Sequence, residues 1–163
     1  MEGALEFLGE REDVEDGRIG GLGLSTGADV LIEAAPEHRV LKAVVSDGAT
    51  ARSFADQAAV HGLDVTTPFV WTFITGSRVL SGASPGPPLE DLVPRVAPTP
   101  LLLVAAGSVL GEREFNRHYA EVAREPFEYW ELPAGVGHTA AIRERPEEYE
   151  RRVVRFFDDA LAP

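Results

Sequence analysis

The sequence predicts an α/β domain of three layers, in which helices cover both faces of a mainly parallel sheet of about four strands. Two observations support this fold class. Nearly continuous apolar runs occur at residues 18–24, 41–46, 101–106 and 127–132, and stretches of helical periodicity separate them. Strands buried on both faces contain such runs, and alternation with helices favours parallel pairing. We therefore expect the strands to lie side by side in chain order.

Helices are expected between these strands and at both ends of the chain. The spacing of apolar residues predicts helices at residues 2–10, 27–35, 49–60, 112–124 and 146–161. Residues 61–99 are the least regular part, and their prolines predict a short helix followed by an ordered loop. We interpret residues 61–99 as a cap or loop insertion within one domain that spans residues 1–163.

The composition excludes several classes of function. The chain carries 15 basic and 27 acidic side chains, and this net charge of −12 argues against a nucleic-acid partner. There is no cysteine, which excludes disulfides, thiol catalysis and thiolate metal sites. No apolar stretch is long enough for a membrane span, and residues 1–13 lack the pattern of a signal peptide. We therefore expect a cytoplasmic protein.

Residues 23–27 read Gly-Leu-Ser-Thr-Gly and match the G-x-S-x-G pattern between a predicted strand and a predicted helix. A nucleophile in this pattern stands on a tight turn that lifts its hydroxyl above the sheet, and Gly23 and Gly27 leave room for that turn. Ser25 is the candidate nucleophile, and the Thr26 N–H is a candidate oxyanion donor at a helix N-terminus. The alternative is a glycine-rich turn in which Ser25 only caps the helix.

A serine nucleophile needs a base, and the base needs a carboxylate that orients it. His138 is the candidate base, because its glycine-rich loop directly follows the last predicted strand. Asp47 and Glu112 compete for the role of orienting carboxylate, with Glu114 as a third candidate. Asp47 and Glu112 each follow a predicted strand, at the sheet edge where active sites of parallel sheets form.

These segments resemble those of a known family. Residues 18–27 resemble the nucleophile strand and elbow of α/β-hydrolases, and are most similar to dienelactone-hydrolase-like and acyl-peptidase-like bacterial members. Residues 130–139 resemble the last strand and the catalytic-histidine loop, and residues 100–107 the strand before the acid. The resemblance implies a serine hydrolase that cleaves a small carboxylic ester, thioester or amide through an acyl-enzyme. It implies no metal and no organic cofactor.

The chain departs from this family in two ways. Leu110 stands where the resemblance would place the acid. Only residues 1–17 precede the nucleophile strand, whereas the family has several strands there, so the chain resembles the C-terminal half of a partial α/β-hydrolase fold. The absent strands normally carry the second oxyanion donor. Residues 18–24 would then form an apolar sheet edge, and such an edge favours a homodimer that covers it.

The apolar segment near residue 70 is a candidate wall of the acyl pocket. Phe69, Trp71 and Phe73 would line this pocket if the segment forms a cap over the active site. The alternative is an ordinary buried helix.

Two other functions remain compatible with the sequence. Gly21, Gly23 and Gly27 form a loosened G-x-G-x-x-G pattern, and Asp47 follows about 20 residues later, as in a dinucleotide-binding βαβ unit. This interpretation explains neither Ser25 at the centre of the turn nor the His138 loop. The third possibility is a non-catalytic module with a hydrolase-like fold that binds a partner or a ligand.

Overall fold

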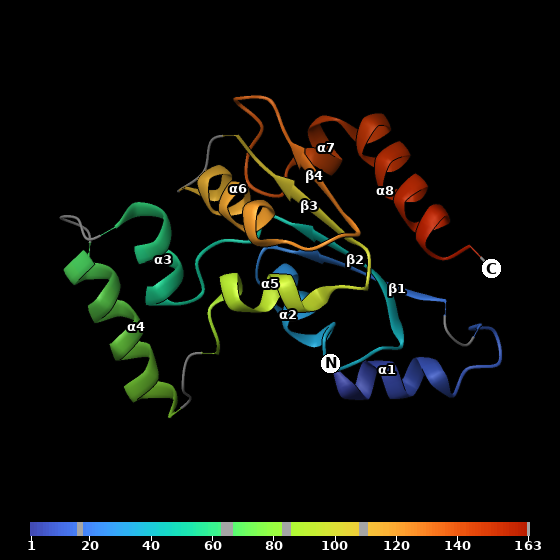
Figure 1. The fold of residues 1–163 in the computed structure, drawn as a ribbon, viewed down its shortest axis with the longest axis horizontal. Helices are drawn as coiled ribbons and strands as arrows, with labels where there is room; N and C mark the ends of the chain where they lie inside the picture. Colours follow the sequence, from blue (N-terminus) through green and yellow to red (C-terminus); the bar gives the residue numbers. More distant parts are fainter. Residues whose placement is uncertain (16–17, 63–66, 83–85, 108–110, 163) are drawn as a thin grey trace.

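The computed structural model describes residues 1–15, 18–62, 67–82, 86–107 and 111–162 (Figure 1). Its centre is a four-stranded parallel sheet in the order β1-β2-β3-β4. The strands are β1 (Ile19–Leu24), β2 (Leu41–Asp47), β3 (Leu101–Ala105) and β4 (Phe127–Glu131). The predicted strands, their parallel pairing and their order are therefore confirmed.

Eight helices occur within the described residues. They are α1 (Glu2–Gly9), α2 (Thr26–Ala34), α3 (Phe54–His61), α4 (Thr67–Ser81), α5 (Leu89–Val96), α6 (Glu112–Val122), α7 (Ala141–Glu144) and α8 (Pro146–Ala160). The five predicted helices are all present. Helix α3 begins later than predicted because Ser53 and Asp56 form a capping box, in which each side chain accepts the other residue's backbone N–H.

Helix α5 was not predicted, because its sequence looks like part of a proline-rich loop. Pro94 lies inside the helix, where it removes one backbone hydrogen bond. Four apolar residues at helical spacing nevertheless become buried: Leu89, Leu92, Val93 and Val96. Burial of this face against α2 and α6 outweighs the cost of the proline.

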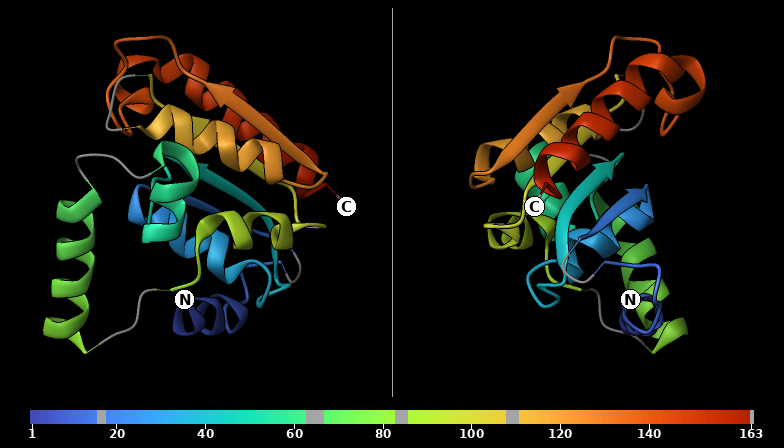
Figure 2. Two further views of the ribbon diagram at one scale, coloured as in Figure 1. Left: turned by 60° about the vertical axis from the view of Figure 1, so that its left-hand side comes forward. Right: turned by 90° about the vertical axis from the view of Figure 1, so that its right-hand side faces the viewer.

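Two apolar clusters hold the three layers together. In β2, Val44 packs into the cluster on the side of α2, α5 and α6, whereas the next residue, Val45, packs into the cluster on the side of α7 and α8. Leu103 and Leu102 divide in the same way in β3. Figure 2 shows the sheet between these helices. The two central strands, β2 and β3, are therefore apolar at successive residues because both of their faces are covered.

Strand β1 is the edge of the sheet and pairs only with β2 among the described strands. Gly20 packs against Phe157 of α8, but α8 leaves Leu22 and Leu24 uncovered further along the strand. Leu22 is 42% exposed and Leu24 is 41% exposed. Strand β1 carries no charged residue that would discourage pairing with another chain. No described helix has the length and apolar character that crossing a membrane requires.

We expect this edge to make the protein self-associate. Light scattering during size-exclusion chromatography should give a mass that rises with concentration toward that of a dimer, because an uncharged strand edge can pair with its copy. The Leu22→Lys variant should stay monomeric, since a lysine on the edge strand opposes pairing. Ile142→Lys is the control, because Ile142 is similarly exposed but lies on α7. A wild-type protein that is monomeric at every concentration would contradict this expectation.

Candidate active site

The turn between β1 and α2 holds Ser25 in an unusual backbone conformation. Its φ is 54° and its ψ is −124°, a region that residues other than glycine rarely adopt. Two hydrogen bonds fix it there. The Ser25 N–H donates to the Asp47 carbonyl at 2.8 Å, and the Ala28 N–H donates to the Ser25 carbonyl at 2.8 Å. The strain is thus held by the neighbouring strand and by the first turn of the helix.

The two glycines of the motif have different roles. A Cβ on Gly23 would lie 2.3 Å from the Gly27 carbonyl oxygen, so β1 and α2 could not approach as closely with any other residue at position 23. A Cβ on Gly27 would meet nothing within 4 Å. The expectation that both glycines make room for the turn therefore holds for Gly23 and is wrong for Gly27.

Ser25, His138 and Glu112 lie in one chain of hydrogen bonds. Nε2 of His138 is 2.9 Å from Oγ of Ser25, and Nδ1 of His138 is 2.6 Å from Oε2 of Glu112. Because an ionised Glu112 can only accept, it fixes the proton on Nδ1 and leaves Nε2 free to accept the serine proton. The structure thus brings together three residues separated by 113 and 26 positions in the sequence.

Glu112 owes its position to the start of α6. It is the first residue of that helix and its side chain has no exposed surface. Its second oxygen, Oε1, accepts the Ala106 backbone N–H at 2.6 Å. The positive end of the helix dipole also favours a negative charge at this place. These contacts offset the cost of burying a carboxylate.

Among the described residues, neither of the other candidate carboxylates is hydrogen-bonded to His138. Oδ2 of Asp47 accepts the Tyr149 hydroxyl at 2.9 Å, and Glu114 points to solvent. Burial is the main reason that the pKa of Asp47 rises to about 6, and the hydrogen bond from Tyr149 opposes that rise. Asp47 is also fully buried, so it cannot bind a ribose as the dinucleotide interpretation requires.

The loop after β2 packs against the imidazole ring of His138. Gly48 has a φ of 80°, and a Cβ there would lie 2.9 Å from Cε1 of His138. Two residues of α6 hold this loop. The side-chain amide of Asn116 donates to the Ala49 carbonyl at 2.7 Å, and the Tyr119 hydroxyl donates to the Thr50 carbonyl at 3.1 Å. The sequence pattern does not single out Asn116 and Tyr119 for this role, although the Asp-Gly pair at positions 47 and 48 is a turn signal.

Thr26 opens α2 directly after Ser25 and is exposed. As the first residue of the helix, its N–H has no acceptor within the helix. It can therefore donate to an anion that forms above Ser25, where the helix dipole also favours negative charge. Among the described residues, no cluster of three or more histidine or acidic side chains could hold a metal ion.

The predicted acyl pocket is not formed by Phe69, Trp71 and Phe73. These side chains are 76%, 57% and 68% exposed, on a helix α4 that stands apart from the sheet and packs against α3 (Figure 1). The alternative, an ordinary buried helix, is wrong as well. Helix α4 carries many large apolar residues but packs mainly against α3 among the described helices, so several of these side chains stay in solvent.

Comparison with solved structures identifies the fold. An alpha/beta hydrolase from Penicillium sp. sh18, GrgF, superimposes with a TM-score of 0.72 at 16% identity, over 99% of this chain and 70% of that one. The Pyrococcus furiosus esterase Pf2001 gives a TM-score of 0.65 at 23% identity, over 99% and 60%. The 2,6-dihydroxy-pseudo-oxynicotine hydrolase gives 0.65 at 18% identity, over 99% and 45%.

The chain therefore has a partial α/β-hydrolase fold, as its sequence predicts. It spans between 45% and 70% of the length of these three structures. The sequence itself matches no family model and no curated protein.

The two glycines of the turn provide a test of its geometry. Gly23→Ala should lower the free energy of unfolding by about 1–3 kcal/mol, because the added methyl overlaps the backbone of α2. Gly27→Ala should leave it unchanged or raise it by up to about 1 kcal/mol, because alanine favours a helix where space is open. Urea unfolding measures the free energy of unfolding of both variants. Equal decreases in the two variants would contradict the different roles assigned to Gly23 and Gly27.

Proposed function

We propose that this chain is a serine hydrolase that cleaves a small carboxylic ester, thioester or amide through an acyl-enzyme. The observation that carries the proposal is the continuous path from Ser25 through His138 to Glu112, at 2.9 and 2.6 Å. The strained backbone of Ser25 supports it, because such conformations gather at functional sites. Several solved structures that share the fold are described as hydrolases or esterases.

In the first half of the reaction, Oγ of Ser25 attacks the carbonyl carbon while Nε2 of His138 takes the hydroxyl proton. Glu112 stabilises the resulting imidazolium through Nδ1. The tetrahedral intermediate then collapses, and His138 returns the proton to the leaving alcohol, thiol or amine. The acyl group is left on Ser25.

In the second half, a water molecule takes the place of the leaving group. His138 removes its proton as it attacks the acyl carbon, and Ser25 recovers the proton as the carboxylic acid departs. The Thr26 N–H and the N-terminus of α2 stabilise the oxyanion in both halves. Loss of one oxyanion donor typically costs about 10²–10³ in rate, so a site with Thr26 as its single donor would be a slow catalyst.

A second candidate is a non-catalytic module that binds another protein. The exposed aromatic residues of α4, Phe69, Trp71 and Phe73, favour it, because large exposed apolar patches mark interaction surfaces. The dinucleotide interpretation has no comparable support. Activity measurements on the variants below separate the enzyme from the binding module.

Hydrolysis of p-nitrophenyl acetate should depend on Ser25. The wild-type protein is expected to release p-nitrophenol above the buffer rate, and Ser25→Ala should reduce the release to that rate because the nucleophile is lost. Circular dichroism of Ser25→Ala verifies that the variant is folded. Equal turnover by the two proteins would refute the hydrolase and favour the binding module.

The role of Glu112 can be separated from a general effect of negative charge on α6. Glu112→Gln should lower kcat by about 10³–10⁴-fold, because the neutral amide no longer fixes the proton on Nδ1 of His138. Glu114→Gln is the matched control, since Glu114 lies two residues away on the same helix but is exposed. Similar rates for Glu112→Gln and wild type would remove Glu112 from the mechanism.

A further inference from the structure

A second buried carboxylate lies behind the proposed catalytic residues and has no part in the mechanism above. Asp47 ends β2 and has no exposed surface. Its Oδ2 accepts the Tyr149 hydroxyl at 2.9 Å, while Oδ1 is buried and has no hydrogen-bond partner among the described residues. A fully buried carboxylate with one unsatisfied oxygen is costly for folding, so its presence calls for an explanation.

Asp47 is joined to both reacting side chains through the backbone. Its carbonyl accepts the Ser25 N–H at 2.8 Å and so helps to hold the nucleophile in its strained conformation. The next residue, Gly48, lies against the ring of His138, where a Cβ would come within 2.9 Å of Cε1 and 3.1 Å of Nδ1. The backbone at Asp47 and Gly48 therefore connects the Asp47 side chain to both Ser25 and His138.

Asp47 also interacts electrostatically with the site. Among the described residues, the charges of Glu112 on α6 and of His138 in the loop before α7 act on Asp47, and the Tyr149 hydroxyl of α8 donates a hydrogen bond to it. The neighbouring strands β1 and β3 contribute no titratable group. Burial raises the pKa of Asp47 to about 6, the Tyr149 hydrogen bond lowers it, the Glu112 charge raises it, and the His138 charge lowers it.

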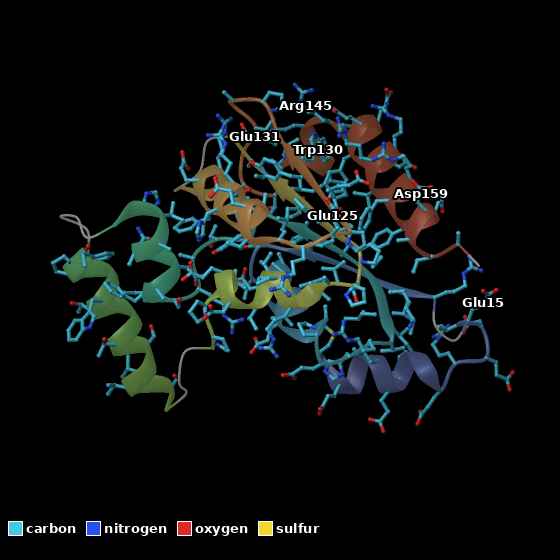
Figure 3. All side chains as sticks on the ribbon, viewed as in Figure 1. Glu15, Glu125, Trp130, Glu131, Arg145 and Asp159 are labelled. Atoms are coloured by element: carbon cyan, nitrogen blue, oxygen red, sulfur yellow. The ribbon has the colours of Figure 1, made fainter. Side chains whose placement is uncertain are left out.

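Tyr149 is fixed in place by aromatic packing. Its ring lies 6.0 Å from that of Trp130, and Arg152 covers the Trp130 ring at 4.6 Å. Figure 3 shows Trp130 on β4, beside helix α8 that carries Tyr149. The Tyr149 hydroxyl is thus directed at Oδ2 of Asp47 by packing of the Tyr149 ring against Trp130.

We propose that Asp47 is a positioning residue for His138, whose negative charge favours the imidazolium that forms when Ser25 loses its proton. Tyr149 assists by keeping Asp47 ionised. This role rests on the proposed function, in which His138 is the base. The coupling is reciprocal: because a positive His138 favours the ionised form of Asp47, an ionised Asp47 favours a positive His138 by the same free energy.

The direction of the pH effect follows from this coupling. Asp47 is mostly ionised above pH 6, where its charge holds a proton on His138 more strongly. Removing that charge makes His138 release its proton at lower pH. The acid limb of kcat/KM, which reports the loss of the neutral base in the free enzyme, must then move to lower pH. A residue that only supported the fold would reduce the rate equally at every pH.

The test is the pH profile of Asp47→Asn, Tyr149→Phe and wild type, together with an NMR titration of the His138 ring assigned with a His138→Asn spectrum. In Asp47→Asn, both the acid limb and the His138 midpoint should move down by about half a unit to one unit. Tyr149→Phe should shift both in the same direction by less, because the Tyr149 hydrogen bond lowers the pKa of Asp47 and its loss leaves Asp47 less ionised.

The matched control is Tyr129→Phe. Tyr129 also donates to a carboxylate, Glu131, but on the outer strand β4 and away from Asp47, so neither value should change. Unchanged midpoints in Asp47→Asn and Tyr149→Phe would overturn the proposal, even if their rates fall. If Asp47→Asn does not fold by circular dichroism, Tyr149→Phe decides alone.

Failure of the proposed function gives a different result. If the wild-type protein hydrolyses no ester, the hydrolase proposal fails. The NMR titration still answers the question about Asp47, because it needs no substrate. A downward shift would then support the electrostatic coupling of Asp47 to His138, and its absence would overturn it.

Discussion

The hydrogen bond between the buried Glu112 and His138 is the interaction on which the rest of the site depends. It joins the start of α6 to the loop after β4. With Nδ1 of His138 held by Glu112, the other ring nitrogen, Nε2, is directed at Oγ of Ser25. The parallel sheet brings the loops that carry these residues close together, because the carboxyl ends of all four strands lie at one edge. Only the fully buried environment of Glu112 makes the orientation specific.

Residue patterns in the sequence predict much of the fold and two residues of the site, Ser25 and His138. The two central strands, β2 and β3, are apolar at successive positions, and this pattern indicates a sheet covered on both faces. Ser25 stands out because its motif falls between a strand and a helix, and His138 because its loop follows the last strand. Both are local features of the sequence, so they can be recognised without knowledge of the tertiary contacts.

The remaining features depend on contacts that a pattern does not contain. Asp47 and Glu112 both follow strands, and only the Tyr149 hydroxyl and the Ala106 N–H decide which one turns to His138. The helix around Pro94 forms because a buried face compensates for the proline. An apolar run usually indicates a buried element, but Phe69 in the apolar run of α4 is exposed.

The central claim is that Ser25 is a hydroxyl activated by His138, and a fluorophosphonate probe tests it without any assumption about the substrate. Peptide mass spectrometry should find one phosphonyl adduct, on Ser25, and labelling should fall strongly in His138→Gln because the base is absent. An unlabelled Ser25 in the wild-type protein, or equal labelling in His138→Gln, would contradict the account.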